Sequence, residues 1–281
     1  KSFCFDQKST SFVKSFMVVV FFLFGIIGIQ AQTTLIDPAQ EGGFNVGNTF
    51  ASNGWSVSNG PNNPWVVSNG VTTAPIAGNA AYISDTGGST HTYDKTKNAE
   101  NFFWRDVTVP AGETRIKLTF DWLTTGATGN DAFYVFAVPT SVTPTGSANY
   151  PGTGNGPTPT MPGSYSVFIG GHTATTVQSQ TIFFPTSYAG TTFRLVFYWK
   201  NNNDATGTQP PGLVDNISLK SQVPMTFTSV TSGNTTNPAT WGETVEYPGN
   251  ADNIVISTGH TVSISGNSNE YVGSVTVNGT L

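Results

Sequence analysis

The residue with the clearest capacity for chemistry is Asp215. Apolar residues alternate around it, and the positions that share its side of an extended strand are Leu213, Ile217 and Leu219. Side chains at every second position of a strand point the same way, so a core that receives Ile217 and Leu219 also receives Asp215. A carboxylate buried without a partner costs several kcal/mol. We therefore expect Asp215 to have a partner, such as backbone N–H groups at a turn or an arginine.

Tryptophans form a second group of candidates, because flat aromatic faces stack on the rings of sugars. Trp122 and Trp199 alternate with apolar residues and are expected to pack in a core. Trp55 and Trp65 lie in a segment rich in glycine, asparagine and proline. These two are the candidates for an exposed ligand-binding platform, and packing in the core is the competing interpretation.

No pattern of residues indicates catalysis. The histidines lie far apart, and the chain has neither a Gly-x-Ser-x-Gly nor a Gly-x-x-x-x-Gly-Lys motif. No pair of acidic residues has a spacing that argues for a glycosidase, which needs two carboxylates roughly 5–10 Å apart. We assign no catalytic residue, and the sequence favours a protein that is not an enzyme.

The elements that must position these residues are strands, because apolar and polar residues alternate with a period of two along most of the chain. About ten such segments with turn residues between them are typical of an all-β, two-sheet sandwich, and we expect a jelly roll over residues 32–222. The predicted strands are Gly54–Ser58, Trp65–Ser68, Ala80–Ser84, Phe102–Val109, Thr114–Leu123, Ala132–Val138, Tyr165–Ile169, Thr176–Phe184, Thr192–Lys200 and Leu213–Lys220.

Two segments depart from this pattern. The proline-rich stretch from Pro139 to Pro162 is too long for an ordinary hairpin, and we interpret it as a tolerated insertion or a ligand-contacting loop. After a boundary near residue 222 the strands become short and closely spaced, at Asn253–Ser257, Thr261–Ser265 and Ser274–Val277. Residues 223–281 therefore predict the start of a right-handed parallel β-helix, and we expect further chain beyond Leu281.

The N-terminal residues predict export. Lys8 and Lys14 precede an apolar run from Phe16 to Ile29, which is shorter than the 20 or so residues that span a bilayer, and small residues follow it. We predict a signal peptide over residues 1–31, a secreted or cell-surface location, and no membrane span after cleavage. The one cysteine, Cys4, lies before the run, so a lipid anchor of the lipoprotein type and disulfides in the mature chain are not expected.

Composition narrows the function classes. The net charge is −5 and there is no basic patch, so binding to nucleic acid is disfavoured. Charged residues are 10% of the chain, against about 25% in an average protein. Aromatic residues reach 12%, which indicates a packed core rather than disorder.

Several motifs carry a resemblance to a known family. The chain from Phe44 to Leu219 resembles the jelly-roll modules of Bacteroidetes surface proteins, which are related to MAM and cleaved-adhesin domains and are also called choice-of-anchor domains. Vertebrate MAM domains carry disulfides and the mature chain has no cysteine, so their adhesive function does not transfer directly. The motifs are Asn53-Gly54-Trp55, Gly78–Ser84, Phe102–Val107, Leu118–Trp122 and Asp215–Leu219.

This resemblance adds a metal to the possible partners of Asp215. In related carbohydrate-binding jelly rolls, the matching aspartate of the last strand helps to hold a structural calcium ion together with groups near the N-terminus. The resemblance therefore implies a Ca²⁺ site formed by Asp215 with Asp37, Glu41 and Asn45. Calcium prefers about six to eight oxygen ligands, which carboxylates, amides and backbone carbonyls supply.

Residues 228–281 carry a second resemblance, to the G8-like entry of β-helical regions in the same bacteria. Its markers include Asn237–Gly242, Asp252–Ile256 and Gly259–Val262. Such proteins often end in a type IX sorting domain. Together the two resemblances imply a non-catalytic extracellular module that binds a glycan or a surface protein. The alternatives are an accessory N-terminal region of a secreted polysaccharide-degrading enzyme and a structural spacer.

Overall fold

A computed structural model describes residues 32–280 apart from 72–75, 77, 127–130, 149–164, 171–173, 250 and 265–272. The chain divides into two units, residues 1–31 and residues 32–281. The predicted signal peptide lies outside the described residues, as does most of the proline-rich segment. Within the described part of the chain, no helix is long and apolar enough to cross a bilayer.

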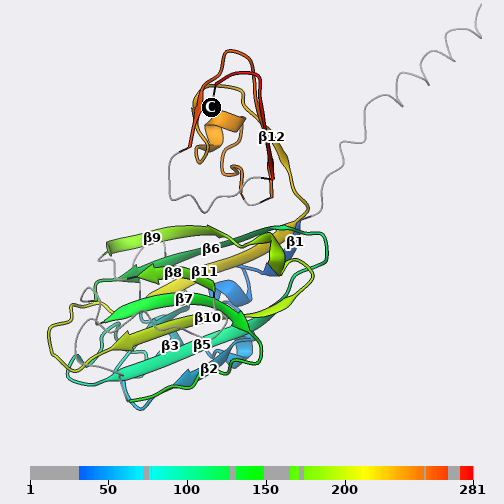
Figure 1. Cartoon of the computed structure of the whole chain (residues 1–281). Coiled ribbons are helices and arrows are strands. Elements are labelled where there is room, and N and C mark those ends of the chain that lie inside the picture. Colours follow the sequence, from blue (N-terminus) through cyan, green and yellow to red (C-terminus); the bar gives the residue numbers. More distant parts are fainter. Residues whose placement is uncertain are drawn as a thin grey trace, which may run out of the picture. The chain divides into compact units, whose positions relative to one another are not determined.

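Two antiparallel sheets form the main body of the second unit (Figure 1). In the first sheet the strand order is β3-β4-β11-β6-β9, with β1 also paired to β11; in the second it is β2-β5-β10-β7-β8. The strands of the first sheet are β1 (Thr33–Ile36), β3 (Trp65–Ser68), β4 (Ala80–Ile83), β6 (Arg115–Thr124), β9 (Ala174–Phe183) and β11 (Leu213–Gln222). Those of the second are β2 (Ser56–Asn59), β5 (Ala99–Thr108), β7 (Ala132–Pro139), β8 (Tyr165–Gly170) and β10 (Thr192–Asn201).

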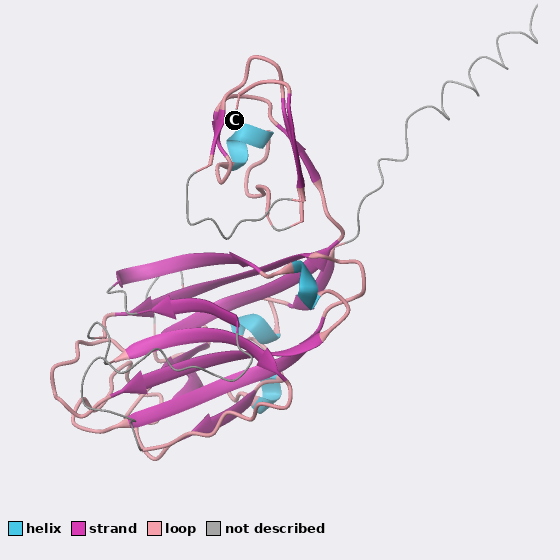
Figure 2. Cartoon of the chain, in the orientation of Figure 1, coloured by secondary structure: helices cyan, strands magenta, loops and turns pink. Residues whose placement is uncertain are grey.

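The predicted all-β sandwich is confirmed. Each of the ten predicted strands has a counterpart, and the chain changes sheet at most connections, as in a jelly roll. The sequence missed β1, a short strand that pairs with the last strand of the sandwich. In the described part of the chain, four 3₁₀-helices accompany the strands (Figure 2), namely η1 (Glu41–Gly43), η2 (Ala51–Asn53), η3 (Thr186–Tyr188) and η4 (Pro238–Trp241).

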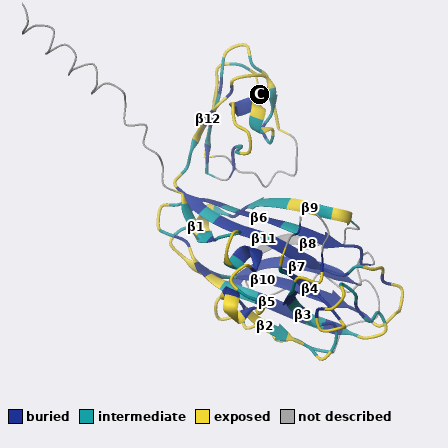
Figure 3. Ribbon diagram, turned by 180° about the vertical axis from the view of Figure 1, so that it is seen from behind, coloured by how far each residue is buried: buried dark blue, intermediate teal, exposed yellow. Residues whose placement is uncertain are grey.

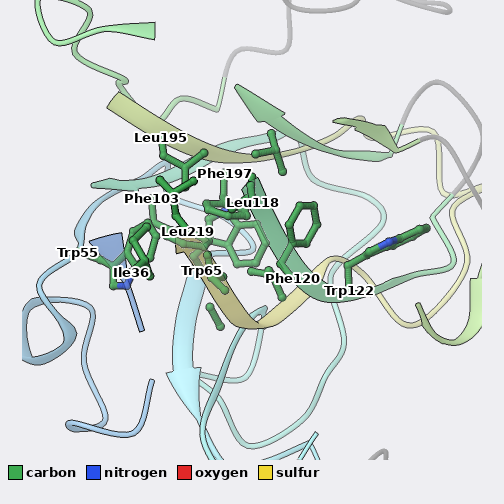
Figure 4. Close-up of a cluster of buried hydrophobic side chains, with 14 of the residues drawn as sticks. Ile36, Trp55, Trp65, Phe103, Leu118, Phe120, Trp122, Leu195, Phe197 and Leu219 are labelled. Atoms are coloured by element: carbon green, nitrogen blue, oxygen red, sulfur yellow. The ribbon is translucent and has the colours of Figure 1, made fainter. Parts of the chain in front are cut away.

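The core between the sheets is aromatic (Figure 4). In β10 the residues Phe193, Leu195, Phe197 and Trp199 face inward, as their alternation predicts. The ring of Phe197 stacks on Phe103 of the neighbouring β5, with centroids 4.7 Å apart. The inward-facing positions of the central strands β5, β6, β7, β10 and β11 are buried (Figure 3), which explains why these strands hold their register without disulfides.

The C-terminal part has a different organisation. Strands β12 (Thr226–Thr228), β14 (Asn253–Ile256) and β16 (Ser274–Val277) form a parallel sheet, and β13 (Gly233–Asn234) pairs in parallel with β15 (Val262–Ser263). These short strands enclose a small core of their own. Its buried residues are Phe227, Trp241, Ile254, Ile256 and Val262.

Candidate functional site

The two tryptophans predicted as an exposed platform are in the core, so that prediction is wrong. Trp55 and Trp65 are 3% and 2% exposed. The indole N–H of Trp55 donates to the carbonyl of Glu41 at 2.9 Å, and that of Trp65 donates to the carbonyl of Asn101 at 3.1 Å. An indole whose only polar group is satisfied can be buried completely. These backbone partners come from η1 and β5, and the polar segment around the two tryptophans does not keep their rings in water.

Trp104 is the tryptophan that does meet solvent. All six tryptophans lie among the described residues, and the other five are buried. Trp104 lies in β5 next to Phe103, which faces the core, so the period of two places Trp104 on the outer face of the second sheet. The alternation within Phe102–Val107 was the signal that could have identified it from sequence.

The outer face around Trp104 is unusually aromatic. Tyr198 in β10 lies opposite Phe102 in β5 and opposite Tyr134 in β7. Its ring stacks on Phe102 with centroids 4.4 Å apart and on Tyr134 with centroids 5.7 Å apart. Two residues earlier in β10, on the same face, Val196 lies opposite Trp104 and Phe136. We call the side chains of Phe102, Trp104, Tyr134, Phe136 and Tyr198 the aromatic face.

Charged pairs flank the aromatic face along β10. At one end Arg194 binds Asp106 through two contacts, Nε to Oδ1 at 2.7 Å and Nη2 to Oδ2 at 3.0 Å. The Arg194 guanidinium carbon lies 5.5 Å from the centre of the Trp104 ring. At the other end the Lys200 ammonium lies 5.5 Å from the centre of the Tyr134 ring. A cation over an aromatic ring is attracted to the ring face and helps to hold the ring in place.

The described beginning of the proline-rich segment lies across this face. Val142 packs against the aromatic face, and its carbonyl accepts a hydrogen bond from Arg194 Nη1 at 2.6 Å. Further along, Ser147 pairs with Glu100 of β5. Phe102, Tyr134, Phe136 and Tyr198 are buried, whereas Trp104 and Asp106 remain accessible. The accessible part of the site is therefore the Trp104 end.

Asp215 is buried, but not on the side that the sequence predicts. A β-bulge follows it, with Asn216 in the left-handed region at a φ of 52°. The bulge shifts the alternation, so Ile217 and Leu219 face the sandwich core while Asp215 lies on the outer face opposite Asp121. Within the described residues the Oδ1 atom of Asp215 has no hydrogen-bond partner. Burial raises the pKa of Asp215 to about 7, and the nearby charge of Asp121 adds to the effect.

The predicted calcium partners of Asp215 lie in the N-terminal loop. This loop touches β11 near the bulge, since a Cβ atom on Gly42 would lie 1.8 Å from the carbonyl oxygen of Ile217. Asp37 accepts from the N–H of Ala39 at 2.9 Å. Glu41 lies 3.5 Å from Arg105, in an ion pair.

Asn45 completes the predicted set and donates to the carbonyl of Ala39 at 3.4 Å. No three acidic, histidine or cysteine side chains come together among the described residues. A calcium ion at Asp215 would therefore depend on amide and backbone oxygens as well as on carboxylates.

The raised pKa of Asp215 predicts how stability depends on pH. The folded state keeps the proton up to about pH 7, whereas the ordinary pKa is 3.8. The folded state thus binds more protons between these values, and the free energy of unfolding falls as pH rises through this range. We expect Asp215→Asn, measured by urea unfolding at pH 8 in EDTA, to be more stable than the parent by about 1–3 kcal/mol. At pH 4 the difference should nearly vanish, and an equal effect at both pH values would contradict this account.

Comparison with known proteins gives the following result. No protein-family profile and no curated protein sequence matches the chain. Among solved structures, the K3 cleaved adhesin domain of Lys-gingipain from Porphyromonas gingivalis W83 is 17% identical, with a TM-score of 0.37, over 67% of this chain and 98% of that one. TmCBM61 in complex with β-1,4-galactotriose is 14% identical, with a TM-score of 0.38, over 65% of this chain and 97% of that one.

A further match is the enzymatically active domain of tailspike protein 4 of bacteriophage CBA120. It is 10% identical, with a TM-score of 0.36, and the match covers 67% of this chain and 22% of that one. The fold and the candidate site are therefore assigned from the contacts described above.

Proposed function

We propose that this chain is a non-catalytic glycan-binding module and that the Trp104 end of the aromatic face contacts the sugar. The observation that carries the proposal is the aromatic outer face, which the sandwich core does not use. One face of an antiparallel sheet is ordinarily polar when it meets water. Here it carries stacked rings, four of which are buried, and its partly exposed tryptophan lies beside an ion pair, Arg194 with Asp106.

The chemistry of this corner suits a sugar ring. The partly exposed Trp104 ring offers an apolar surface for the C–H groups of a pyranose. The Asp106 side chain is 43% exposed and has oxygens that accept hydrogen bonds from hydroxyl groups. Ser56 lies opposite Trp104 in β2 and is exposed, so its hydroxyl can donate or accept. A ring stacked on an aromatic surface and held at its rim by polar groups is how ligand sites combine affinity with orientation.

Trp104→Ala tests this function. On a glycan array followed by calorimetry with the best hits, we expect the parent chain from Gln32 onward to bind glycans and the variant to bind them about 10- to 100-fold more weakly. Val57→Ala is the matched control, because Val57 is 41% exposed in the neighbouring β2 and should not affect binding. If the variant bound the same glycans as tightly as the parent, the binding site would not be at Trp104. An array without hits would rule out glycan binding.

The finer assignments from the resemblance remain part of this proposal. We infer an exported surface module of the cleaved-adhesin type from a Bacteroidetes species that uses type IX secretion. The apolar run Phe16–Ile29 supports export. The parallel pairing of β12, β14 and β16 supports the interpretation of residues 223–281 as the first rungs of a right-handed β-helix.

A structural calcium ion at Asp215 is a separate proposal. Its support is the unpartnered Oδ1 atom of Asp215, together with the contact that the loop carrying Asp37 and Asn45 makes with Ile217, two residues further along β11. Glu41 is the weakest member of the set, because Arg105 already engages it. When bound, the ion would neutralise Asp215 and fix the N-terminal loop to β11.

Calcium addition tests this site without a binding assay. A ligand present at 100 times its Kd raises the free energy of unfolding by about 2.7 kcal/mol. We expect millimolar Ca²⁺ to raise the melting temperature of the parent and to leave that of Asp215→Asn unchanged. Asp106→Asn is the control, since Asp106 lies in the other sheet and should respond like the parent. Equal responses in all three proteins would count against the site.

A further inference from the structure

The charges beside Trp104 identify the class of glycan, an inference that rests on the proposed function. Arg194 is the basic group whose guanidinium lies over the Trp104 ring, and each of its three guanidinium nitrogens already donates a hydrogen bond. Two of these bonds go to Asp106 and one goes to the carbonyl of Val142. A guanidinium recognises a carboxylate or sulfate through two parallel N–H groups. In Arg194 that pair of groups is taken by the protein's own carboxylate.

Lys200, the second cation beside the aromatic face, is also unavailable to an anionic ligand. Lys200 is 2% exposed and lies over Tyr134. Its strand neighbour Glu100 accepts a hydrogen bond from the Tyr198 hydroxyl at 2.8 Å. The two acidic and two basic side chains that flank the aromatic face therefore sum to zero charge. An anionic ligand would gain no unpaired cation there and would approach the exposed carboxylate of Asp106.

The groups that remain free suit hydroxyl groups. Asp106 keeps lone pairs toward solvent, Ser56 presents a hydroxyl, and the Arg194 guanidinium has N–H groups beyond the three in use. Neutral sugars bring hydroxyls that both donate and accept, and they carry no charge to desolvate. We propose that the ligand of this site is a neutral polysaccharide chain and not a uronate, sulfated or sialylated one.

An array holding neutral, uronate, sulfated and sialylated glycans tests this class directly. We expect hits that depend on Trp104 among neutral glycans, with affinities that change less than twofold between 50 and 500 mM NaCl. The sharpest comparison uses pairs of glycans that differ only in oxidation at C6, such as cellohexaose and a β-1,4-glucuronate hexamer. In every pair in which either member binds, the neutral member should bind at least tenfold more tightly. Anionic hits that depend on Trp104 would overturn the charge class and leave the proposed function intact. An array without hits would overturn the proposed function itself.

Asp106→Asn tests whether the ion pair sets the preference for neutral glycans, because it removes the carboxylate that binds Arg194. The side chain of Asp106 lies at the surface, 43% exposed, so the variant should fold, which circular dichroism and the melting temperature verify. We expect the preference for neutral over C6-oxidised hexamers to fall at least fivefold in this variant. Ser56→Ala, which leaves the ion pair in place, should keep the parent's preference. A preference that Asp106→Asn leaves unchanged would show that the ion pair does not set the class.

Discussion

Replacing Arg115 with methionine is expected to lower the free energy of unfolding by about 3–5 kcal/mol. Arg115 begins β6 and is 1% exposed. Its Nε atom donates to Asp252 Oδ2 at 2.6 Å, and its Nη2 atom donates to Glu246 Oε2 at 2.8 Å. Methionine keeps much of the side-chain volume and removes the charge, so Asp252, which is fully buried, loses its ionic partner.

The surroundings of Arg115 explain why the effect should reach beyond one ion pair. Its guanidinium carbon lies 5.1 Å from the ring centre of Phe183 in β9 and 5.8 Å from that of Phe227 in β12. Asp252 also accepts from the backbone N–H of Met225 at 2.8 Å. The guanidinium thus joins the sandwich to the parallel strands. In the parent we expect amide hydrogen exchange in β10 and β14 to report the same unfolding free energy, and in Arg115→Met the amides of β14 should exchange first.

Arg105→Met is the matched control for this prediction. Arg105 forms an ion pair with Glu41 at 3.5 Å, with side chains 28% and 22% exposed, and such pairs contribute at most about 1 kcal/mol. A double variant, Arg115→Met with Asp252→Leu, should recover part of the lost stability, because it also removes the buried carboxylate that Arg115→Met leaves without an ionic partner. If Arg115→Met cost no more than Arg105→Met in urea unfolding, the buried cluster would not hold the two parts together.

Trp65→Ala is expected to cost about 3–5 kcal/mol in stability, the usual range for a large aromatic residue removed from a core. The Trp65 ring meets Phe103 edge to face at 5.1 Å and Phe133 at 5.9 Å. Truncation would leave a cavity between the sheets and would leave the carbonyl of Asn101 without its indole donor. Chemical denaturation followed by circular dichroism measures the loss.

Trp104→Ala provides the comparison for Trp65→Ala. Because Trp104 is partly exposed on the outer face, its truncation should cost roughly 1 kcal/mol while weakening glycan binding. Trp65→Phe should retain most of the packing and have an intermediate stability. The reverse order, with Trp104→Ala the more destabilising variant, would contradict the assignment of Trp65 to the core and Trp104 to the ligand.

Local alternation predicted much of the fold because it reflects the geometry of a single strand. In β10 the inward residues from Phe193 to Trp199 are those that the period of two selects. The same rule applied to β5 separates Phe103 from Trp104 and thus points to the aromatic face. The rule fails at Asp215, where the bulge at Asn216 changes the side that each following residue faces. The bulge is a property of the pairing between β11 and β6, two strands that are distant in sequence.

The sequence by itself determined that this chain is built from strands, that its aromatic residues suffice for a core and that two kinds of strand pattern follow one another. Tertiary structure decided which polar groups meet. It buried Trp55 and Trp65 because backbone carbonyls reach their indoles, and it placed Arg115 against Asp252, 137 positions away. Burial and pairing depend on neighbours that are distant in sequence. The alternation of apolar and polar residues therefore predicts a strand, but it does not tell which residues other parts of the chain bury.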